Sequence, residues 1–514
     1  MPDRRTFLLA ASGAALSTLT LALTPRPLAL PRFDQNPFTL GIAAGYPQPD
    51  GIVLWTRLAP DALNGGGMPD TAVEVTWEIA DSDTFTHVLR KGVERATAEL
   101  AHSVHAEISG LDAARVYWYR FHAGAATSTT GRFRTAPASA AANERLRFAL
   151  ASCQQYEQGY FSAYRHMARE DLDLVIHVGD YIYESSWGNN LVRSHGSPEA
   201  ITLTDYRNRY ALYKSDADLQ AAHAAFAWLV TWDDHEVSND YANDRSQRDD
   251  PRTAFLQRRA AAYQAYYEHM PLPAWARPLG ADARLYTQAG LGQLVRVFML
   301  DDRQYRSHQV CARPGRGGSA VVKPADCPER LSPDLTLLGT EQERWLNSAL
   351  ETSTARWNII AQQTLMATQT RIVNGEQGYW TDGWDGYPKA RERLLGFIAE
   401  RQISNPLVLG GDVHNAIVAD LKVNFDDAKS PVVATEFVGT SITSQGPGAK
   451  ITEAALQNNP HLKFSNGTRR GYTAFDVSTA QCSVRLRALS RVTDPQATIS
   501  DLASFVVAHG KAGA

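Results

Sequence analysis

Eight side chains that can bind metal ions or transfer protons closely follow four short apolar runs of the sequence. The runs are RFALA, LVIHV, AWLVT and PLVLG. The side chains that follow them are Cys153, Asp180, Tyr183, Asp233, Asp234, His235, Asp412 and His414. Carboxylates are seldom left at buried strand ends unless they are paired or bind a metal. The coincidence therefore predicts a metal site, although a single Gly-Asp pair is more simply a turn or a helix cap.

The mixture of donor atoms suits two metal ions. Carboxylate oxygens bind Ca²⁺, Mg²⁺, Mn²⁺ or Fe³⁺, while imidazole and thiolate bind transition ions. Two ions about 3.5–4 Å apart, bridged by one carboxylate, can clamp a phosphoryl group and lower the pKa of a bound water. Asp180 is the expected bridge. Tyr183 is expected to bind the same ion as phenolate, the alternative being a tyrosine that only packs over the site.

These side chains need a scaffold whose strands end at one place. From residue 147 onward, buried-type strand runs alternate with Ala/Arg/Glu/Tyr-rich helical segments, which predicts an α/β layered domain over 147–514. Ligands bind at the carboxyl edge of such sheets. Before it, alternating segments such as VEVTWEIA and VYWYRFHAG predict an all-β sandwich of immunoglobulin or fibronectin type over 36–136. A stretch without periodicity, 137–146, is the expected linker.

The first 31 residues have the layout of an export signal. Arg4 and Arg5 precede Phe7 and an Ala/Leu-rich apolar stretch that is too short for a comfortable membrane span. This arrangement resembles the twin-arginine signal. We therefore predict export by the twin-arginine machinery to the periplasm or outside the cell, with residues 1–31 removed and no transmembrane anchor left. The balance of 55 acidic and 51 basic residues gives no reason to expect a nucleic-acid partner.

The four cysteines fall into different settings. Cys311 and Cys327 bracket the loop segment PGRGGSAVVKPAD, and an oxidising compartment favours a disulfide between them. Cys482 lies in the alternating run QCSVRLRAL and is expected to be a strand residue. Cys153 remains for the metal site.

The order of the sequence blocks resembles the PhoD-type alkaline phosphatases of the metallophosphoesterase superfamily. The blocks are ASCQQYEQGYFSAY, HVGDYIYE, TWDDHEVSNDYA, LDDRQYR, GGDVHNA and EFVGTSITS. The resemblance runs from the export signal to the C-terminus. It implies a layered metallophosphoesterase domain behind the sandwich, and an enzyme that hydrolyses phosphate monoesters and diesters, including lipid-derived ones.

The resemblance also implies roles for single residues around a ferric ion. Cys153, Asp180 and Tyr183 would bind Fe³⁺. His235 would be the general acid that protonates the leaving group after attack by a metal-bound hydroxide.

Departures from the wider superfamily pattern imply a second, harder ion. Asp234 stands where the superfamily usually has asparagine, and Asp412 stands where it has a histidine. His414 matches the last histidine of the same motif, and Asp233 is a further expected ligand. Replacing nitrogen by oxygen favours Ca²⁺, with one or two such ions expected.

Several neighbouring residues leave alternatives open. Arg303 and Arg306 in LDDRQYR are expected to bind phosphate oxygens, or else to pair internally with Asp301 or Asp302.

Two further predictions concern possible metal ligands outside the main set. Gln362 or Gln363 is the candidate for the missing upstream histidine ligand of the superfamily. An acidic segment is either an extra Ca²⁺ site or a solvated loop; its members are Asp233, Asn239, Asp240 and Asp244.

Two rival functions remain at this stage. One is a phospholipase D-like phosphodiesterase of the same family. The other is a non-catalytic binding module in which the sandwich does the binding and the metals only stabilise the fold.

Overall fold

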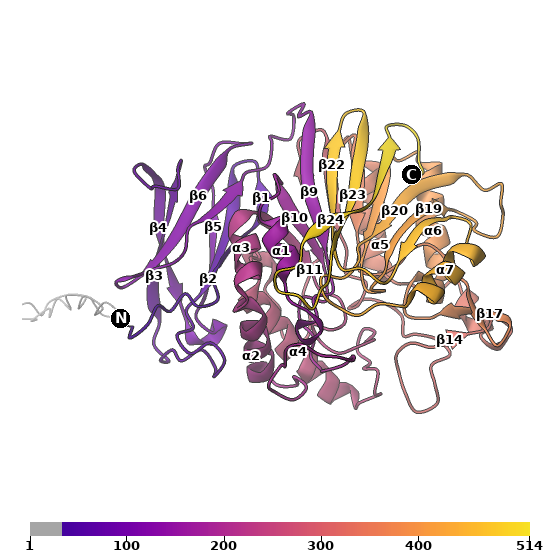
Figure 1. The fold of residues 1–514 in the computed structure, drawn as a ribbon, viewed down its shortest axis with the longest axis horizontal. Helices are drawn as coiled ribbons and strands as arrows, with labels where there is room; N and C mark the ends of the chain where they lie inside the picture. The colour runs from indigo at the N-terminus through magenta and orange to yellow at the C-terminus, as the bar shows by residue number, and fades with distance from the viewer. Residues whose placement is uncertain (1–32) are drawn as a thin grey trace, which may run out of the picture.

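A computed structural model describes residues 33–514, and the predicted export signal lies outside this range. The described chain forms two large sheets that pack face to face, with helices on the outer faces and a β-sandwich at one end (Figure 1). The predicted fold class, an α/β layered domain with an N-terminal all-β sandwich, is confirmed.

The first large sheet has four parallel strands at its centre, β9, β10, β11 and β1. All residues of β10 and β11 are buried, because their continuous apolar runs face packed layers on both sides. The order is β24-β23-β22-β9-β10-β11-β1-β2-β5. The bounds are β24 (Ile499–Ala508), β23 (Gln481–Leu489), β22 (Gly471–Ser478), β9 (Arg145–Ala151), β10 (Leu174–Val178), β11 (Ala227–Thr231), β1 (Ile42–Gln48), β2 (Gly51–Arg57) and β5 (Ser103–Ile108).

The second large sheet has four parallel strands, β13, β15, β18 and β20. Aromatic rings join it to the first sheet, since Phe437 on β20 meets Phe475 on β22 edge to face with centroids 5.5 Å apart. The bounds, in sheet order, are β12 (Thr287–Leu291), β13 (Val295–Met299), β15 (Trp357–Ala361), β18 (Pro406–Gly410), β20 (Val432–Val438), β19 (Ala416–Lys422) and β21 (Leu462–Asn466).

The N-terminal sandwich shares a sheet with the layered domain. Strand β1 pairs with β2 on one side and runs parallel to β11 on the other, with Ala44 opposite Ala227. The second sheet of the sandwich packs on β1-β2-β5 through its own apolar core. Its strands are β4 (Val88–Ala96), β3 (Val73–Ala80), β6 (Val116–Ala123), β7 (Ala126–Thr127) and β8 (Gly131–Arg134).

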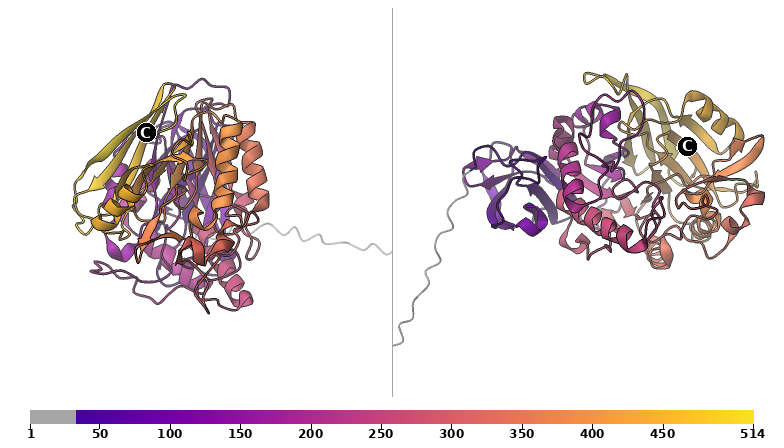
Figure 2. Two further views of the ribbon diagram at one scale, coloured as in Figure 1. Left: turned by 90° about the vertical axis from the view of Figure 1, so that its right-hand side faces the viewer. Right: turned by 90° about the horizontal axis from the view of Figure 1, so that it is seen from below.

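Helices cover the outer faces of both large sheets. Helices α1 to α4 lie against the first sheet, and α5 and α6, orange in Figure 2, lie along the second. Helix α2 begins with a capping box in which Thr202 and Asp205 each accept the other's backbone N–H. The bounds are α1 (Ser162–Met167), α2 (Leu203–Lys214), α3 (Ala217–Ala225), α4 (Arg252–His269), α5 (Gly339–Glu351) and α6 (Pro388–Glu400).

A small sheet and a last helix lie together beyond the ends of the second sheet (Figure 1). They are β14 (Val321–Val322), β17 (Glu376–Trp380), β16 (Arg371–Val373) and α7 (Ala449–Asn458). The short 3-10 helices are η1 (Ala98–Leu100), η2 (Tyr156–Gln158), η3 (Ala274–Ala276), η4 (Pro324–Asp326), η5 (Pro328–Leu331) and η6 (Trp384–Gly386). Within residues 33–514, none of the helices has the length and apolar character needed to cross a membrane.

Candidate metal centre

The candidate ligands meet where the carboxyl ends of the two parallel sheets come together. The loops after β9, β10 and β11 carry one part of the set, and the loop after β18 carries the other. The side chains form three groups, and the donor atoms within each group all lie within 4.8 Å of one another. The groups are Cys153, Asp180 and His414; Asp180, Asp234 and His235; and Asp233, Asp234 and Asp412. Asp180 and Asp234 each belong to two groups, as expected of residues between two ions.

The backbone is strained at four of these positions. The φ angles of Cys153, Asp180, Asp412 and His414 are 58°, 57°, 60° and 51°, in the left-handed region that residues other than glycine rarely adopt. Such strain persists where the surrounding structure demands it, commonly at functional sites. Gly179 also has a positive φ, and a Cβ there would lie 2.4 Å from Cβ of Asp233, so the two ligand loops approach too closely for a side chain.

Tyr183 and His414 complete the cysteine-containing group. The Tyr183 hydroxyl donates to Asp180 Oδ2 at 2.7 Å and lies 3.0 Å from His414 Nε2. His414 donates its Nδ1 proton to the carbonyl of Gln445 at 2.9 Å. This bond leaves the Nε2 lone pair facing Asp180 and Tyr183, as a metal-binding histidine requires.

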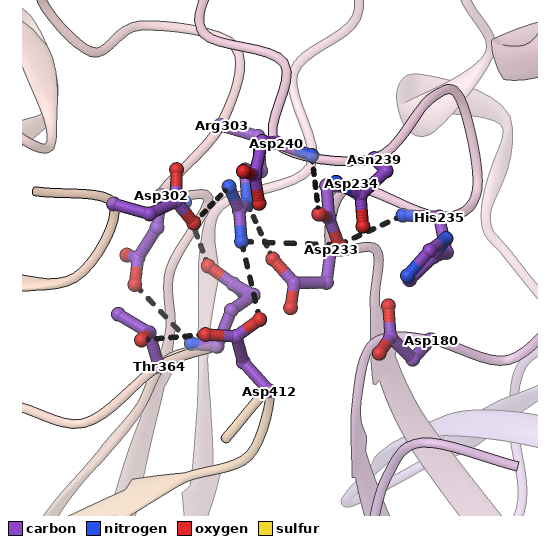
Figure 3. A network of polar contacts seen from close by, with 12 residues as sticks. Asp180, Asp233, Asp234, His235, Asn239, Asp240, Asp302, Arg303, Thr364 and Asp412 are labelled. Atoms are coloured by element: carbon purple, nitrogen blue, oxygen red, sulfur yellow. Dashed lines mark hydrogen bonds and ion pairs between the residues drawn. The ribbon is translucent and has the colours of Figure 1, made fainter. Parts of the chain in front are cut away.

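The second part of the centre is built around buried carboxylates and Arg303 (Figure 3). The Arg303 guanidinium donates to Asp233 and lies 3.5 Å from Asp412 and 3.8 Å from Asp234. Thr364 donates to Asp412 Oδ2 at 2.9 Å. Arg303 also pairs with Asp382 at 2.7 Å, so one arginine faces four carboxylates.

The electrostatics of this cluster favour added cations. Burial raises the pKa of Asp233 and of Asp412, and the nearby charge of Asp234 raises it further although Arg303 opposes the shift. Burial and the charge of Asp180 also raise the pKa of the Cys153 thiol. Metal ions reverse these shifts by pairing with the ionised groups.

The residues present fit metal ions on independent grounds. Asp180 Oδ1 and Asp233 Oδ2 are buried carboxylate oxygens without a hydrogen-bond partner in residues 33–514. A buried carboxylate oxygen without a partner is costly unless a cation completes it. Thiolate, phenolate and imidazole next to carboxylates suit a transition ion beside a hard oxygen-binding ion.

Two functional glutamates were not predicted from the sequence. Glu184 accepts the Nδ1 proton of His235 at 2.6 Å and the backbone N–H of Asn239 at 2.9 Å. Burial lowers the pKa of His235, but the charges of Glu184, Asp234 and Asp180 together raise it well above its usual value. The only local signal for Glu184 was its place at the end of HVGDYIYE.

Glu236 ties two ligand loops together. Its carboxylate accepts backbone N–H groups from Asp180 at 3.1 Å, Tyr181 at 2.6 Å and Asp233 at 2.8 Å. It thereby fixes the spacing between the loops after β10 and β11. Its place directly after His235 was the only available clue.

The substrate-contact prediction for Arg303 and Arg306 has no support in this geometry. Both side chains are fully buried, and both pair with Asp382, at 2.7 and 3.0 Å respectively. The alternative of internal pairing holds, but the ion-pair partner is Asp382 from a distant segment instead of Asp301 or Asp302; Arg306 Nε donates only to the backbone carbonyl of Asp302. These arginines therefore hold buried carboxylates of the protein, Asp233 and Asp382, in position.

The side chains at two other expected ligand positions form hydrogen bonds within the protein. Gln362 and Gln363 are buried, and their amide groups bond to the chain, with Gln363 Oε1 accepting from the Asp302 N–H at 2.7 Å. Neither offers a free oxygen to the centre.

The carboxylates of the acidic segment likewise do not come together in an extra cation site. Asp244 pairs with Arg252 and His308, whereas Asp240 accepts from Ser319 and Gln247. Their carboxylates are therefore used in separate places.

The cysteines follow the predicted division. Cys311 and Cys327 are joined in the predicted disulfide, with a Cα–Cα distance of 6.0 Å. Cys153 and Cys482 are buried and are not disulfide-bonded. Cys482 lies in β23, as expected.

A pocket of about 870 Å³ opens in front of the centre. Asp180, Asp234, His235, Asp412 and His414 line it on one side. Beyond them it extends to the small sheet and α7, so it is much larger than a phosphoryl group requires.

Two packed α/β sheets with such donors at their joined carboxyl edges define a metallophosphoesterase type of domain. The profile of the PhoD-like phosphatase family matches residues 148–486, and that of the PhoD-like phosphatase N-terminal domain matches 24–137. The chain therefore belongs to the PhoD-like phosphatase family, which makes it an enzyme acting on phosphoric ester bonds.

Individual relatives agree with this placement. Alkaline phosphatase D of Bacillus subtilis (strain 168) is 48% identical over 526 residues, covering 99% of this chain and 88% of that protein. A solved structure described as the structure of PhoD has a TM-score of 0.89 at 47% identity and covers 94% of both chains.

Proposed function

We propose that the protein is an exported phosphatase that hydrolyses phosphate monoesters and diesters at this centre. The observation that carries the proposal is Asp180, a buried carboxylate that is shared by two donor groups and has one oxygen without a partner among residues 33–514. His235 lies in the second of these groups. Family membership and the name of the Bacillus relative, alkaline phosphatase D, support the same chemistry.

The centre would hold Fe³⁺ and Ca²⁺ in two adjoining positions. Cys153, Tyr183 and His414 would be the further ligands of Fe³⁺ beside Asp180, because their donor atoms cluster there. Asp234 and Asp412, with Asp233 behind them, offer the oxygen-only set that Ca²⁺ prefers. When bound, the cations supply Lewis acidity toward phosphoryl oxygens and lower the pKa of water.

The chain itself supplies the proton for the leaving group. His235 faces the pocket, and Glu184 holds its Nδ1 side, so Nε2 is the atom available to the substrate. The charge of Glu184 favours the protonated imidazole, and a protonated Nε2 can donate to the departing alkoxide. Glu184 then stabilises the orientation of the ring throughout the reaction.

The pocket favours diesters alongside monoesters. A volume of about 870 Å³ leaves space for a second esterified group next to the phosphoryl position. This keeps the phospholipase D-like phosphodiesterase as the second candidate function. The geometry does not favour the binding-module alternative. None of the donor residues of the centre comes from the sandwich, and His235 lines the pocket.

The test compares metal content and turnover in the same preparations. Protein exported by its own host should contain iron and calcium by elemental analysis. It should hydrolyse p-nitrophenyl phosphate and bis(p-nitrophenyl) phosphate, and the ratio of the two rates distinguishes phosphatase from phosphodiesterase. Asp180→Asn should lose both metals and both activities, whereas Asp244→Asn, outside the centre, should retain them. Zinc as the bound metal, or full activity in Asp180→Asn, would overturn the proposal.

A further inference from the structure

The pocket in front of the centre has an acidic side and a basic side. The acidic lining residues are Asp180, Glu184, Glu199, Asp234, Asp240 and Asp412. The cationic lining residues are Arg248, Arg371 and Lys450. Arg248 pairs with Glu199 at 2.6 Å. Across residues 33–514, the side chains of Arg371 and Lys450 form neither a hydrogen bond nor an ion pair, so two cations face the pocket without a protein partner.

Arg371 is held in place without being neutralised. It lies on β16, and its guanidinium carbon is 5.5 Å from the centroid of the Trp380 ring on the neighbouring strand β17. The charges of Asp385 and Asp412 act on Arg371, but neither carboxylate pairs with it. Asp385 is engaged by Arg391 and by the N–H of Gln369, each at 2.8 Å, and Asp412 accepts from Thr364 at 2.9 Å. A half-buried guanidinium that keeps all its donors free is suited to an anionic ligand.

Apolar side chains line the same pocket as this cation. Val321 on β14, Ile372 on β16 and Ile451 on α7 are exposed, and all three line the pocket. Exposed large apolar residues that gather in one place commonly mark a binding surface. Because they line the same pocket as the acidic centre, they can contact the alcohol part of a phosphate ester bound there.

We propose that Arg371 is a specificity-determining residue that binds a second anionic group on the alcohol side of the substrate, while the apolar side chains contact the carbon chain between the two anions. Lys450 on α7 adds a point charge to the same subsite. The preferred substrates are then phosphate esters whose alcohol portion carries another phosphate or a carboxylate. This inference rests on the proposed function and adds the substrate class to it.

The experiment uses pairs of substrates that differ only in the second anion. The metal-replete protein is assayed on alkanediol bisphosphates, from ethanediol to hexanediol, and on the corresponding hydroxyalkyl monophosphates, with release of inorganic phosphate as the readout. A charge-assisted contact predicts a preference in kcat/KM of about 10- to 100-fold for the bisphosphate, with an optimum at one chain length. The two equivalent phosphates account for a factor of about 2, which is removed first.

Matched variants assign the preference to Arg371. In Arg371→Gln the ratio of bisphosphate to monophosphate kcat/KM should fall to near unity, and Arg371→Lys should restore part of it. Arg344→Gln removes the same charge from an exposed site on α5 and should keep the wild-type ratio. Calorimetry should show tighter binding of propane-1,3-diyl bisphosphonate than of propylphosphonate, with the difference lost in Arg371→Gln.

The outcomes separate this inference from the proposed function. Turnover of monophosphates with no preference for bisphosphates, or an equal preference in Arg371→Gln, contradicts the second-anion subsite alone. A loss of preference in Arg344→Gln as large as in Arg371→Gln would also contradict it, because the effect would then be one of overall charge. Absence of turnover on every substrate in metal-replete protein contradicts the proposed function instead.

Discussion

His235 and Glu184 form a pair whose geometry fits leaving-group protonation, since Nδ1 is tied to a carboxylate and Nε2 is left for the substrate. His235→Ala should lower kcat about 10²–10⁴-fold on alkyl phosphates, whose alkoxide needs a proton. The loss on p-nitrophenyl phosphate should be much smaller, because that leaving group departs as a stable anion. Iron and calcium contents measured alongside should equal those of the wild type. Equal losses on both substrates, or loss of metal, would mean that His235 is a ligand.

Tyr183 offers a spectroscopic test at the same scale. Burial and the charge of Asp180 raise the pKa of its phenol well above the usual value, so ionisation needs a strongly Lewis-acidic cation. A ferric ion bound by phenolate and thiolate should give the protein a broad visible absorption band, and Tyr183→Phe should shift or bleach it. Tyr305→Phe, a hydroxyl deletion outside the pocket, is the control. An unchanged spectrum in Tyr183→Phe would show that the phenol only packs over the centre.

At the scale of elements, helix α2 ends on a buried lysine. Lys214 Nζ lies 4.1 Å from the centroid of the Trp55 ring, and burial lowers the lysine pKa from 10.5 to about 7. Between these values the unfolded chain binds more protons than the folded one, so the free energy of unfolding gains a contribution that rises with pH. Its slope is at most about 1.4 kcal/mol per pH unit.

Denaturation from pH 7 to 10 measures this effect. The stability of Lys214→Met relative to wild type should be highest near pH 7 and should decline as the pH rises, because the variant lacks the lysine contribution. Lys91→Met, at an exposed position, should follow the wild type. A constant difference between Lys214→Met and wild type would show that this lysine stays charged in the fold.

The central parallel strands were predictable, because most of them are short, continuous apolar runs followed by glycine or a polar residue. The candidate ligands could be gathered from the sequence for the same reason, since they closely follow those runs. The partners of Arg303 and Glu236 could not be predicted, because tertiary packing sets them. Arg303 pairs with Asp382, 79 residues away in sequence, and Glu236 accepts from backbone N–H groups. The pairing of β1 with β11 was also hidden, because no local pattern encodes a parallel partner.

At the scale of the whole molecule, the sandwich and the layered domain should unfold together. They share a sheet through β1 and β11, and Trp55, fully buried, donates its indole N–H to the carbonyl of Glu268 on α4. Calorimetry should therefore show one transition. Trp55→Ala should lower the stability of the entire transition by about 3–5 kcal/mol. Two separate transitions, or a shift confined to one of them, would show that the sandwich is an independent unit.

The same β1–β11 pairing constrains the timing of folding during synthesis. Strand β1 ends at Gln48, whereas its parallel neighbour β11 begins at Ala227, so the ribosome must release most of the intervening chain before the shared sheet can close. Until then the outer edge of β1 offers unpaired N–H and C=O groups to other chains. Strands β2 and β5 lie on the opposite side of β1, so they leave this edge open during the interval. An export route that accepts only folded proteins would suit a chain whose first strand pairs with β11 so late in synthesis.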